Sequence, residues 1–122
     1  MFKKLATDAN KKVTILGYTN KVPELMQIAD LIMSKPGGLT TTEILNTHVP
    51  FVIINPIPGQ EEENANFLLN SGAATRIFDA KNTKPFLDNL LSDTVRIENI
   101  KAMQQHIAKP NSTKDIVDII LK

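Results

Sequence analysis

The sequence of 122 residues contains no cysteine and no tryptophan, and its formal net charge is only +1. Without cysteine, neither a disulfide framework nor a thiolate metal site can form. Aromatic residues make up 5% of the chain, so a basic, aromatic-rich surface for stacking bases is not expected. These absences argue against nucleic acid as a partner.

Long apolar runs are also missing. No run approaches the roughly 20 residues that a membrane-spanning helix needs. Met1-Phe2-Lys3-Lys4 is followed by a largely polar stretch and not by the apolar core of a signal peptide. Hydrophobic residues make up 42% of the chain and charged residues 22%, which is typical of a globular domain. We therefore expect one intracellular globular domain.

Short apolar runs alternate with helical patterns in the first two thirds of the chain. The pattern predicts strands at 13–17, 30–34, 51–55 and 75–78, and helices at 23–28, 39–46 and 60–71. Gly72 is expected to end the third helix. Strands that alternate with helices predict an α/β, Rossmann-like open parallel sheet with flanking helices.

The chain changes character after residue 79. Helices are predicted from Thr83 as cap to residue 91, from Asp93 as cap to residue 107, and over 114–121, after a loop at 110–113. Their apolar residues recur at the spacing of core-facing helices. We therefore expect a single domain with a polar lead-in (1–12), a βα core (13–79) and a helical packing segment (80–122).

The first predicted site lies where the run 31–33 is interrupted by Lys35-Pro36-Gly37-Gly38. Leu39 then opens a helix that carries Glu43 about one turn in. A glycine turn before a helix exposes backbone N–H groups and the positive end of the helix dipole to an anion. Glu43 could accept hydrogen bonds from a ribose diol, so a nucleoside diphosphate would suit the site. The glycine pair alone is equally compatible with an ordinary βα turn.

A second strand, break and helix follow. The run 49–55 ends at Pro56-Ile57-Pro58-Gly59, and Gln60 and Glu61 open the next helix. Because ligands of open parallel sheets bind at the carboxyl ends of strands, the two turns should lie side by side. Gln60 and Glu61 could then reach a polyol, whereas Glu62 and Glu63 are interpreted as solvated acids that favour the helix dipole.

Taken together, residues 30–43, 56–61 and 64–66 resemble the carboxyl-terminal, donor-binding half of GT-B glycosyltransferases. The nearest group is that of processive diacylglycerol glucosyltransferases and monogalactosyldiacylglycerol synthases, and the lipid II-forming N-acetylglucosaminyltransferase is more distant. The resemblance implies a UDP-sugar site with the diphosphate at Gly37, Gly38, Leu39 and Thr40, the ribose at Glu43, the sugar at Gln60, Glu61 and Asn64, and uracil at Tyr18 and Thr19.

The same resemblance implies a hexosyltransferase that moves glucose or galactose from UDP-glucose or UDP-galactose to a diacylglycerol-type lipid. In that family the acceptor site and the catalytic base belong to the amino-terminal half. We therefore expect no catalytic residue here, a donor domain truncated on its amino-terminal side, and no activity of this chain alone. No metal or other cofactor is expected. The complete enzyme is expected to be cytoplasmic and peripheral on the inner face of the membrane.

Two other functions remain open from the sequence. The chain could be a small donor-binding subunit that needs a separate acceptor subunit, or a non-enzymatic module that binds a sugar nucleotide. His48 and His106 are far apart in the sequence and are expected to be structural or solvent-facing, because a lone histidine makes no metal site.

Overall fold

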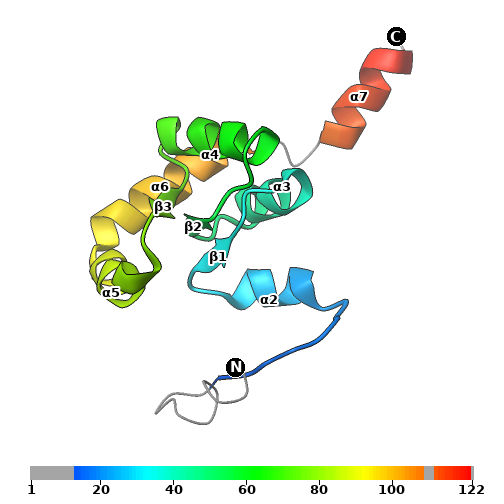
Figure 1. Ribbon diagram of the computed structural model, residues 1–122. Coiled ribbons are helices and arrows are strands. Elements are labelled where there is room, and N and C mark those ends of the chain that lie inside the picture. Colours follow the sequence, from blue (N-terminus) through cyan, green and yellow to red (C-terminus); the bar gives the residue numbers. More distant parts are fainter. Residues whose placement is uncertain (1–12, 109–111, 122) are drawn as a thin grey trace.

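The computed structural model describes residues 13–108 and 112–121 (Figure 1). The expected lead-in at 1–12 and the first half of the expected loop at 110–113 lie outside this part of the chain. Along the sequence the elements are α2 (Val22–Ile28), β1 (Ile32–Ser34), α3 (Gly38–Thr47), β2 (Phe51–Ile54), α4 (Gln60–Asn70), β3 (Thr75–Ile77), the 3-10 helix η1 (Ala80–Asn82), α5 (Thr83–Ser92), α6 (Thr94–Ile107) and α7 (Ser112–Leu121).

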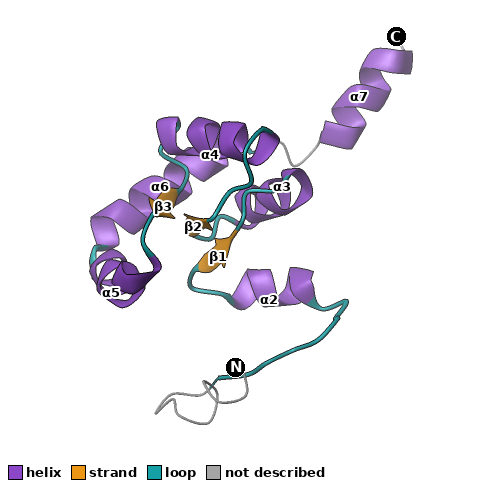
Figure 2. Ribbon diagram, in the orientation of Figure 1, coloured by secondary structure: helices purple, strands orange, loops and turns teal. Residues whose placement is uncertain are grey.

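The three strands form one parallel sheet in the order β1-β2-β3 (Figure 2). Met33 lies opposite Val52, and Ile53 lies opposite Arg76. A helix follows each of the first two strands and returns the chain to the starting edge of the sheet, which is why neighbouring strands run parallel. The expected Rossmann-like parallel sheet is confirmed.

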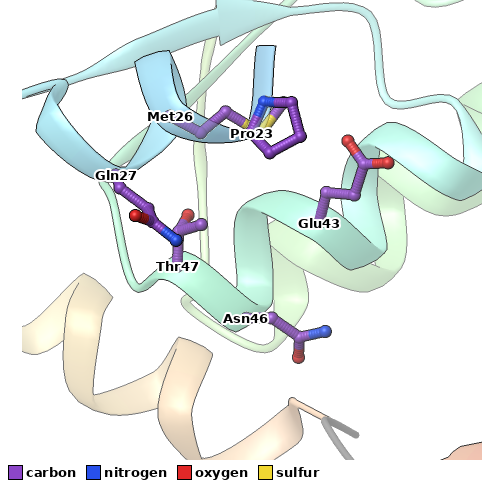
Figure 3. Close-up of a pocket in the computed structure, with 6 residues that line it drawn as sticks. All are labelled: Pro23, Met26, Gln27, Glu43, Asn46 and Thr47. Atoms are coloured by element: carbon purple, nitrogen blue, oxygen red, sulfur yellow. The ribbon is translucent and has the colours of Figure 1, made fainter. Parts of the chain in front are cut away.

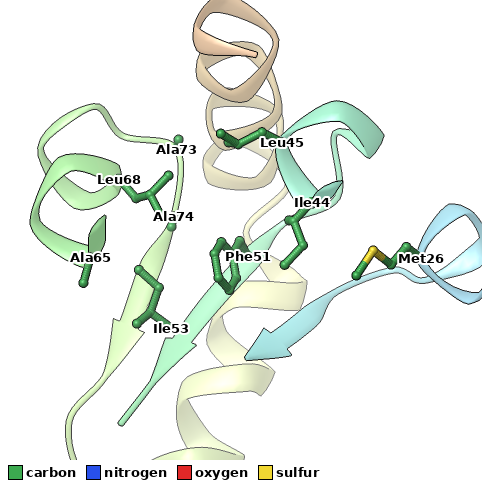
Figure 4. Packing of buried hydrophobic residues seen from close by; sticks show 9 residues of the cluster. All are labelled: Met26, Ile44, Leu45, Phe51, Ile53, Ala65, Leu68, Ala73 and Ala74. Atoms are coloured by element: carbon green, nitrogen blue, oxygen red, sulfur yellow. The ribbon is translucent and has the colours of Figure 1, made fainter. Parts of the chain in front are cut away.

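The central strand β2 is buried on both faces and divides the core into two clusters. Phe51 and Ile53 face a cluster formed by α2, α3, α4 and the segment before β3. Its other members are Met26, Ile44, Leu45, Ala65, Leu68, Ala73 and Ala74 (Figure 4). Val52 points to the opposite cluster, with Ile77, Leu90 and Ile100. This arrangement follows from the alternation of side chains along a strand, and a parallel strand covered on both faces is apolar at every position.

The expected strand at residues 13–17 is not formed. This segment is irregular, and the side chains of Val13, Ile15 and Leu16 are 47%, 51% and 56% exposed. A strand is stable only when a neighbour fills its backbone hydrogen bonds. No described strand pairs with this run, so its β-branched composition alone does not make it part of the sheet.

Helix ends follow their local sequence closely. Gly72 has a φ of 75°, and the N–H of Ala73 donates to the carbonyl of Leu68 at 3.0 Å, which ends α4 as predicted. Asp93 caps α6, because its Oδ1 accepts from the N–H of Arg96 at 3.0 Å. The expectation that Thr83 caps α5 is wrong: Thr83 is its first residue, and its hydroxyl donates to the carbonyl of Ala80.

The last helix departs from the predicted packing. α7 projects away from the sheet (Figure 1), and four apolar side chains in it are exposed: Val117, Ile119, Ile120 and Leu121. The prediction that these residues face the core is therefore wrong. Their helical spacing is correct, but spacing alone does not say which surface covers a helix.

Candidate functional site

The first turn of α3 has open backbone donors. Gly37 precedes the helix with φ −66° and ψ 156°, and among the described residues no side chain caps this end. The first backbone bond into the helix runs from the N–H of Thr41 to the carbonyl of Gly37, at 2.8 Å. The N–H groups of Gly38, Leu39 and Thr40 precede it, so they face the space in front of the helix.

Neither glycine of this turn is required by the fold of the chain. The φ of Gly37 is an ordinary −66°, and Gly38 already belongs to α3. A Cβ added at either position would meet no described atom within 4 Å. The side chain of Leu39 is 83% exposed beside them. The glycines therefore leave open space against the backbone that the protein itself does not fill.

The second turn is shaped by its own backbone. Asn55 follows β2 with a φ of 38°, and Gly59 precedes α4 with a φ of 103°, which only glycine adopts without strain. The carboxylate of Glu61 accepts from the N–H of Ile57 at 2.9 Å and so closes the turn. Gln60 is exposed at the start of α4, and within the described chain no side chain caps that helix either.

The two turns are joined directly. The side-chain amide of Asn64 donates to the carbonyl of Pro36, at 2.9 Å. This bond spans 28 residues of sequence and holds α4 against the glycine turn. The expected side-by-side placement of the two turns at the carboxyl edge of the sheet is therefore present.

The interpretation of Glu62 as a solvated acid is incomplete, because Glu62 also forms a contact within the fold. Its carboxylate forms an ion pair with the guanidinium of Arg76 on β3. Arg76 also stacks on the ring of Phe78, with 4.4 Å from the guanidinium carbon to the ring centre. The two residues are 14 positions apart in the sequence. Because Glu62 belongs to α4 and Arg76 to β3, the ion pair connects this helix to the sheet. Glu63 is exposed, as expected.

α2 and α3 border an open hollow of about 230 Å³ (Figure 3). Each helix contributes three residues at i, i+3 and i+4, and together they are Pro23, Met26, Gln27, Glu43, Asn46 and Thr47. Apart from Glu43, sequence reasoning missed this lining. The signal that could have found it is the matching spacing on two neighbouring helices, which places each set on one face.

Tyr18 and Thr19 lie in the segment before α2. The side chain of Tyr18 is fully exposed, and the hydroxyl of Thr19 accepts from the N–H of Lys21 at 3.1 Å. Neither residue lines the hollow beside Glu43. Their contact with uracil stays a prediction that rests on the resemblance.

Among the described residues, neither histidine belongs to a cluster that could hold a metal ion. His48 has a φ of 57° and ends α3, and His106 is exposed on α6. Within residues 13–108 and 112–121, no three His, Cys, Asp or Glu side chains come together as a possible metal site. None of the described helices has the length and apolarity to span a bilayer.

Comparison with known proteins gives the family. Residues 2–120 match the glycosyltransferase family 28 C-terminal domain. The chain belongs to this family. It is 35% identical over 118 residues to a processive diacylglycerol beta-glucosyltransferase of Bacillus subtilis (strain 168), covering 97% of this chain and 31% of that protein. The Bacillus pumilus (strain SAFR-032) protein of the same name is 35% identical over 107 residues, 88% of this chain and 28% of that protein.

A solved structure agrees with the sequence relatives. The crystal structure of Acinetobacter baumannii MurG superimposes with a TM-score of 0.74 at 28% identity, over 98% of this chain and 37% of that one. The resemblance to the carboxyl-terminal half of a GT-B enzyme is thus confirmed. The chain spans about 31% of the length of the Bacillus subtilis relative.

Proposed function

We propose that this domain is the UDP-sugar donor-binding half of a glycosyltransferase that moves a hexose onto a diacylglycerol-type lipid. One observation carries the proposal: two helices without side-chain caps, each behind a glycine turn, are held together at the carboxyl edge of the sheet by the Asn64–Pro36 bond. The family supports a transferase, and the names of the Bacillus relatives support glucose and diacylglycerol.

The diphosphate would bind in front of α3. Its oxygens would accept from the N–H groups of Gly38, Leu39 and Thr40, and the helix dipole adds a favourable field. The missing Cβ atoms at Gly37 and Gly38 let an anion reach the backbone. When the sugar leaves, negative charge develops on the diphosphate, and preoriented N–H groups stabilise that charge. This proposed mode of activation needs no metal or other cofactor.

The nucleoside would lie toward the hollow between α2 and α3. At about 230 Å³, this hollow is smaller than pockets for whole drug-sized ligands, which are roughly 300–1,000 Å³, so it suits part of a nucleotide. The carboxylate of Glu43 lies at its edge on the exposed side of α3 (Figure 3) and would accept from the ribose hydroxyls. The uracil would lie toward Tyr18 and Thr19.

The hexose would lie at the start of α4. Gln60 is exposed there and free to contact sugar hydroxyls. Glu61 has one oxygen engaged by the N–H of Ile57, which orients the carboxylate and leaves its second oxygen for a hydroxyl. Either glucose or galactose would fit this description. The names of the relatives favour glucose.

The lipid acceptor and the catalytic base would come from an acceptor half, on the same polypeptide or on a separate subunit. The donor would then be held at the carboxyl edge of the sheet while the acceptor half closes over it, at the inner, cytoplasmic face of the membrane. A sugar-nucleotide-binding module without catalysis would need the same donor site but no such partner.

Calorimetry with the 122-residue chain tests the donor site. We expect UDP, UDP-glucose and UDP-galactose to bind and ADP-glucose to bind much more weakly, and the stronger of the two UDP-hexoses identifies the sugar. Equal binding of ADP-glucose would contradict a uridine site. No binding of any nucleotide would contradict the proposed function as a whole.

A further inference from the structure

One hydrogen bond fixes the geometry between the two turns of the site. Asn64 lies one helical turn after Gln60 on α4, and its amide nitrogen donates to the carbonyl of Pro36, at 2.9 Å. The ring of Pro36 is fully buried, so this carbonyl sits on a fixed support. The bond therefore joins two rigid parts and not two mobile loops.

The bonded carbonyl belongs to a peptide unit that is held at both ends. The carbonyl of Pro36 accepts from Asn64, and the N–H of the same unit, on Gly37, donates to the carbonyl of Lys35 at 3.0 Å. Gly37 is the residue from which α3 begins. Fixing this peptide plane fixes the direction in which the open N–H groups of the first turn of α3 point.

Asn64 acts from a helix whose own start is also fixed. Glu61 closes the turn before α4 through the N–H of Ile57, and Glu62 pairs with Arg76 on β3. α4 is therefore a stable reference against which the glycine turn can be set. Without the Asn64 bond, no described side-chain hydrogen bond links α4 to the turn at residues 35–38.

We infer that Asn64 is a positioning residue that sets the diphosphate-binding turn relative to the sugar-binding turn. This inference rests on the proposed function and differs from the direct sugar contact that the resemblance assigns to Asn64. A positioning residue acts on every ligand that uses the diphosphate turn. A residue that reads the sugar acts only on ligands that carry a sugar.

Calorimetry with UDP and UDP-glucose separates these roles. Asn64→Ala is expected to weaken both ligands by the same factor, about three- to tenfold, as for the loss of one hydrogen bond. Asn64→Asp should weaken both at least as much, because a carboxylate cannot donate and faces the lone pairs of the Pro36 carbonyl. Gln60→Ala should weaken UDP-glucose alone, and Asn70→Ala, at an exposed asparagine at the end of α4, should change neither.

A measurement without ligand keeps the test independent of nucleotide binding. Amide hydrogen exchange should rise at Gly37 and Thr41 in Asn64→Ala, because their N–H groups donate within this turn, to the carbonyls of Lys35 and Gly37, and these bonds open more often when the turn is no longer held. It should stay unchanged at both positions in Asn70→Ala. If the unaltered chain binds no nucleotide, the proposed function fails while faster exchange at Gly37 and Thr41 still supports the positioning role of Asn64.

Two results would overturn the inference. The first is a loss confined to UDP-glucose in Asn64→Ala, which would make Asn64 a residue that contacts the sugar. The second is unchanged exchange at Gly37 and Thr41 in a folded Asn64→Ala chain, which would mean that the bond to Pro36 does not set the turn. Should Asn64→Ala fail to fold, Asn64→Ser keeps a short donor and is measured in the same two ways.

Discussion

At the scale of single residues, the most specific prediction concerns the effect of Glu43 on the affinity for UDP. Its carboxylate is exposed beside the hollow between α2 and α3, so it is available to two ribose hydroxyls. Charge-assisted hydrogen bonds contribute about 1.5–3 kcal/mol each in desolvated geometry. Because Glu43 is exposed, its two bonds are expected to contribute only about 1.4–2.8 kcal/mol together. Glu43→Ala should therefore weaken UDP binding roughly ten- to a hundredfold in calorimetry, and Glu43→Gln should lose less because its amide oxygen still accepts.

The stability of both Glu43 variants should change little, since an exposed helix position tolerates either residue. Glu98→Ala, at a carboxylate that is 74% exposed on α6, is the matched control and should leave UDP affinity unchanged. If Glu43→Ala unfolds the domain but keeps its affinity for UDP, the carboxylate serves the fold and not the ligand.

Two glycines of the site should respond to alanine in opposite ways. Gly38 is helical and a Cβ there meets nothing within 4 Å, so Gly38→Ala should leave stability unchanged or raise it by about 0.4–1 kcal/mol. Its methyl group would, however, enter the space of the diphosphate and weaken UDP binding. Gly59 has a φ of 103°, so Gly59→Ala should lower the free energy of unfolding by about 1–3 kcal/mol.

Denaturant unfolding and calorimetry on both glycine variants check this contrast. A destabilised Gly38→Ala chain, or one that binds UDP as tightly as the unaltered chain, would mean that the glycine pair is only part of a turn. The sequence alone is compatible with an ordinary βα turn, because a glycine pair shows that side chains are missing but not that a ligand occupies the free space.

The candidate ligand-binding residues could be predicted from the sequence, but the hydrogen-bond and ion-pair partners of the side chains could not. The glycine turn and Glu43 could be placed because strand, break and helix follow one another along the chain. The bond from Asn64 to Pro36 and the pair of Glu62 with Arg76 join segments 28 and 14 residues apart. Such contacts depend on how the helices pack on the sheet, which no local pattern specifies.

At the scale of elements, the apolar runs predicted β1, β2 and β3 within one or two residues at each end. Each of these runs has a neighbouring strand in the sheet. The run at 13–17 has the same composition and no such neighbour, so it stays irregular. A strand is thus a property of a pair of segments, whereas the cap of α6 at Asp93 and the end of α4 at Gly72 are local and could be predicted directly.

Besides its apolar contacts, α6 is joined to the chain before two strands by one buried polar residue that the sequence pattern did not reveal. Gln104 is fully buried, and its amide nitrogen donates to the carbonyls of Val49 at 2.7 Å and Ala73 at 3.1 Å. These carbonyls precede β2 and β3, so Gln104 connects α6 to the starts of both strands. A glutamine within an amphipathic helix is normally exposed, so the helical pattern of residues 94–107 did not point to a buried Gln104.

Gln104→Ala should lower the free energy of unfolding by about 2–4 kcal/mol, because it leaves two buried carbonyls without donors and removes buried volume. Gln105→Ala, at the exposed neighbouring position, should change it by less than about 0.5 kcal/mol. Urea unfolding of both variants provides the comparison, and similar losses in the two would show that the buried hydrogen bonds contribute little.

At the scale of the whole molecule, the proposed donor site lies on a domain that covers about a third of the length of its Bacillus relatives. The groups proposed for the diphosphate and the hexose belong to the turns after β1 and β2 and to the starts of α3 and α4, at one edge of the sheet. The proteins that match this chain are about three times as long, since it covers 31% and 28% of the two Bacillus relatives. The remaining length of such a protein is where acceptor binding and proton removal would be supplied.

We therefore expect the 122-residue chain to bind UDP-glucose and to transfer no glucose to diacylglycerol in mixed micelles. Transfer requires that the acceptor hydroxyl be held in line with the sugar and that a base remove its proton, and the two effects contribute several orders of magnitude in rate. A chimera that joins this domain to the remainder of the Bacillus subtilis relative should regain turnover. In that chimera Glu43→Ala should raise KM for UDP-glucose, because it weakens binding of the donor. Turnover above background by the isolated chain would place the acceptor site within these 122 residues, and the division of labour proposed here would be wrong.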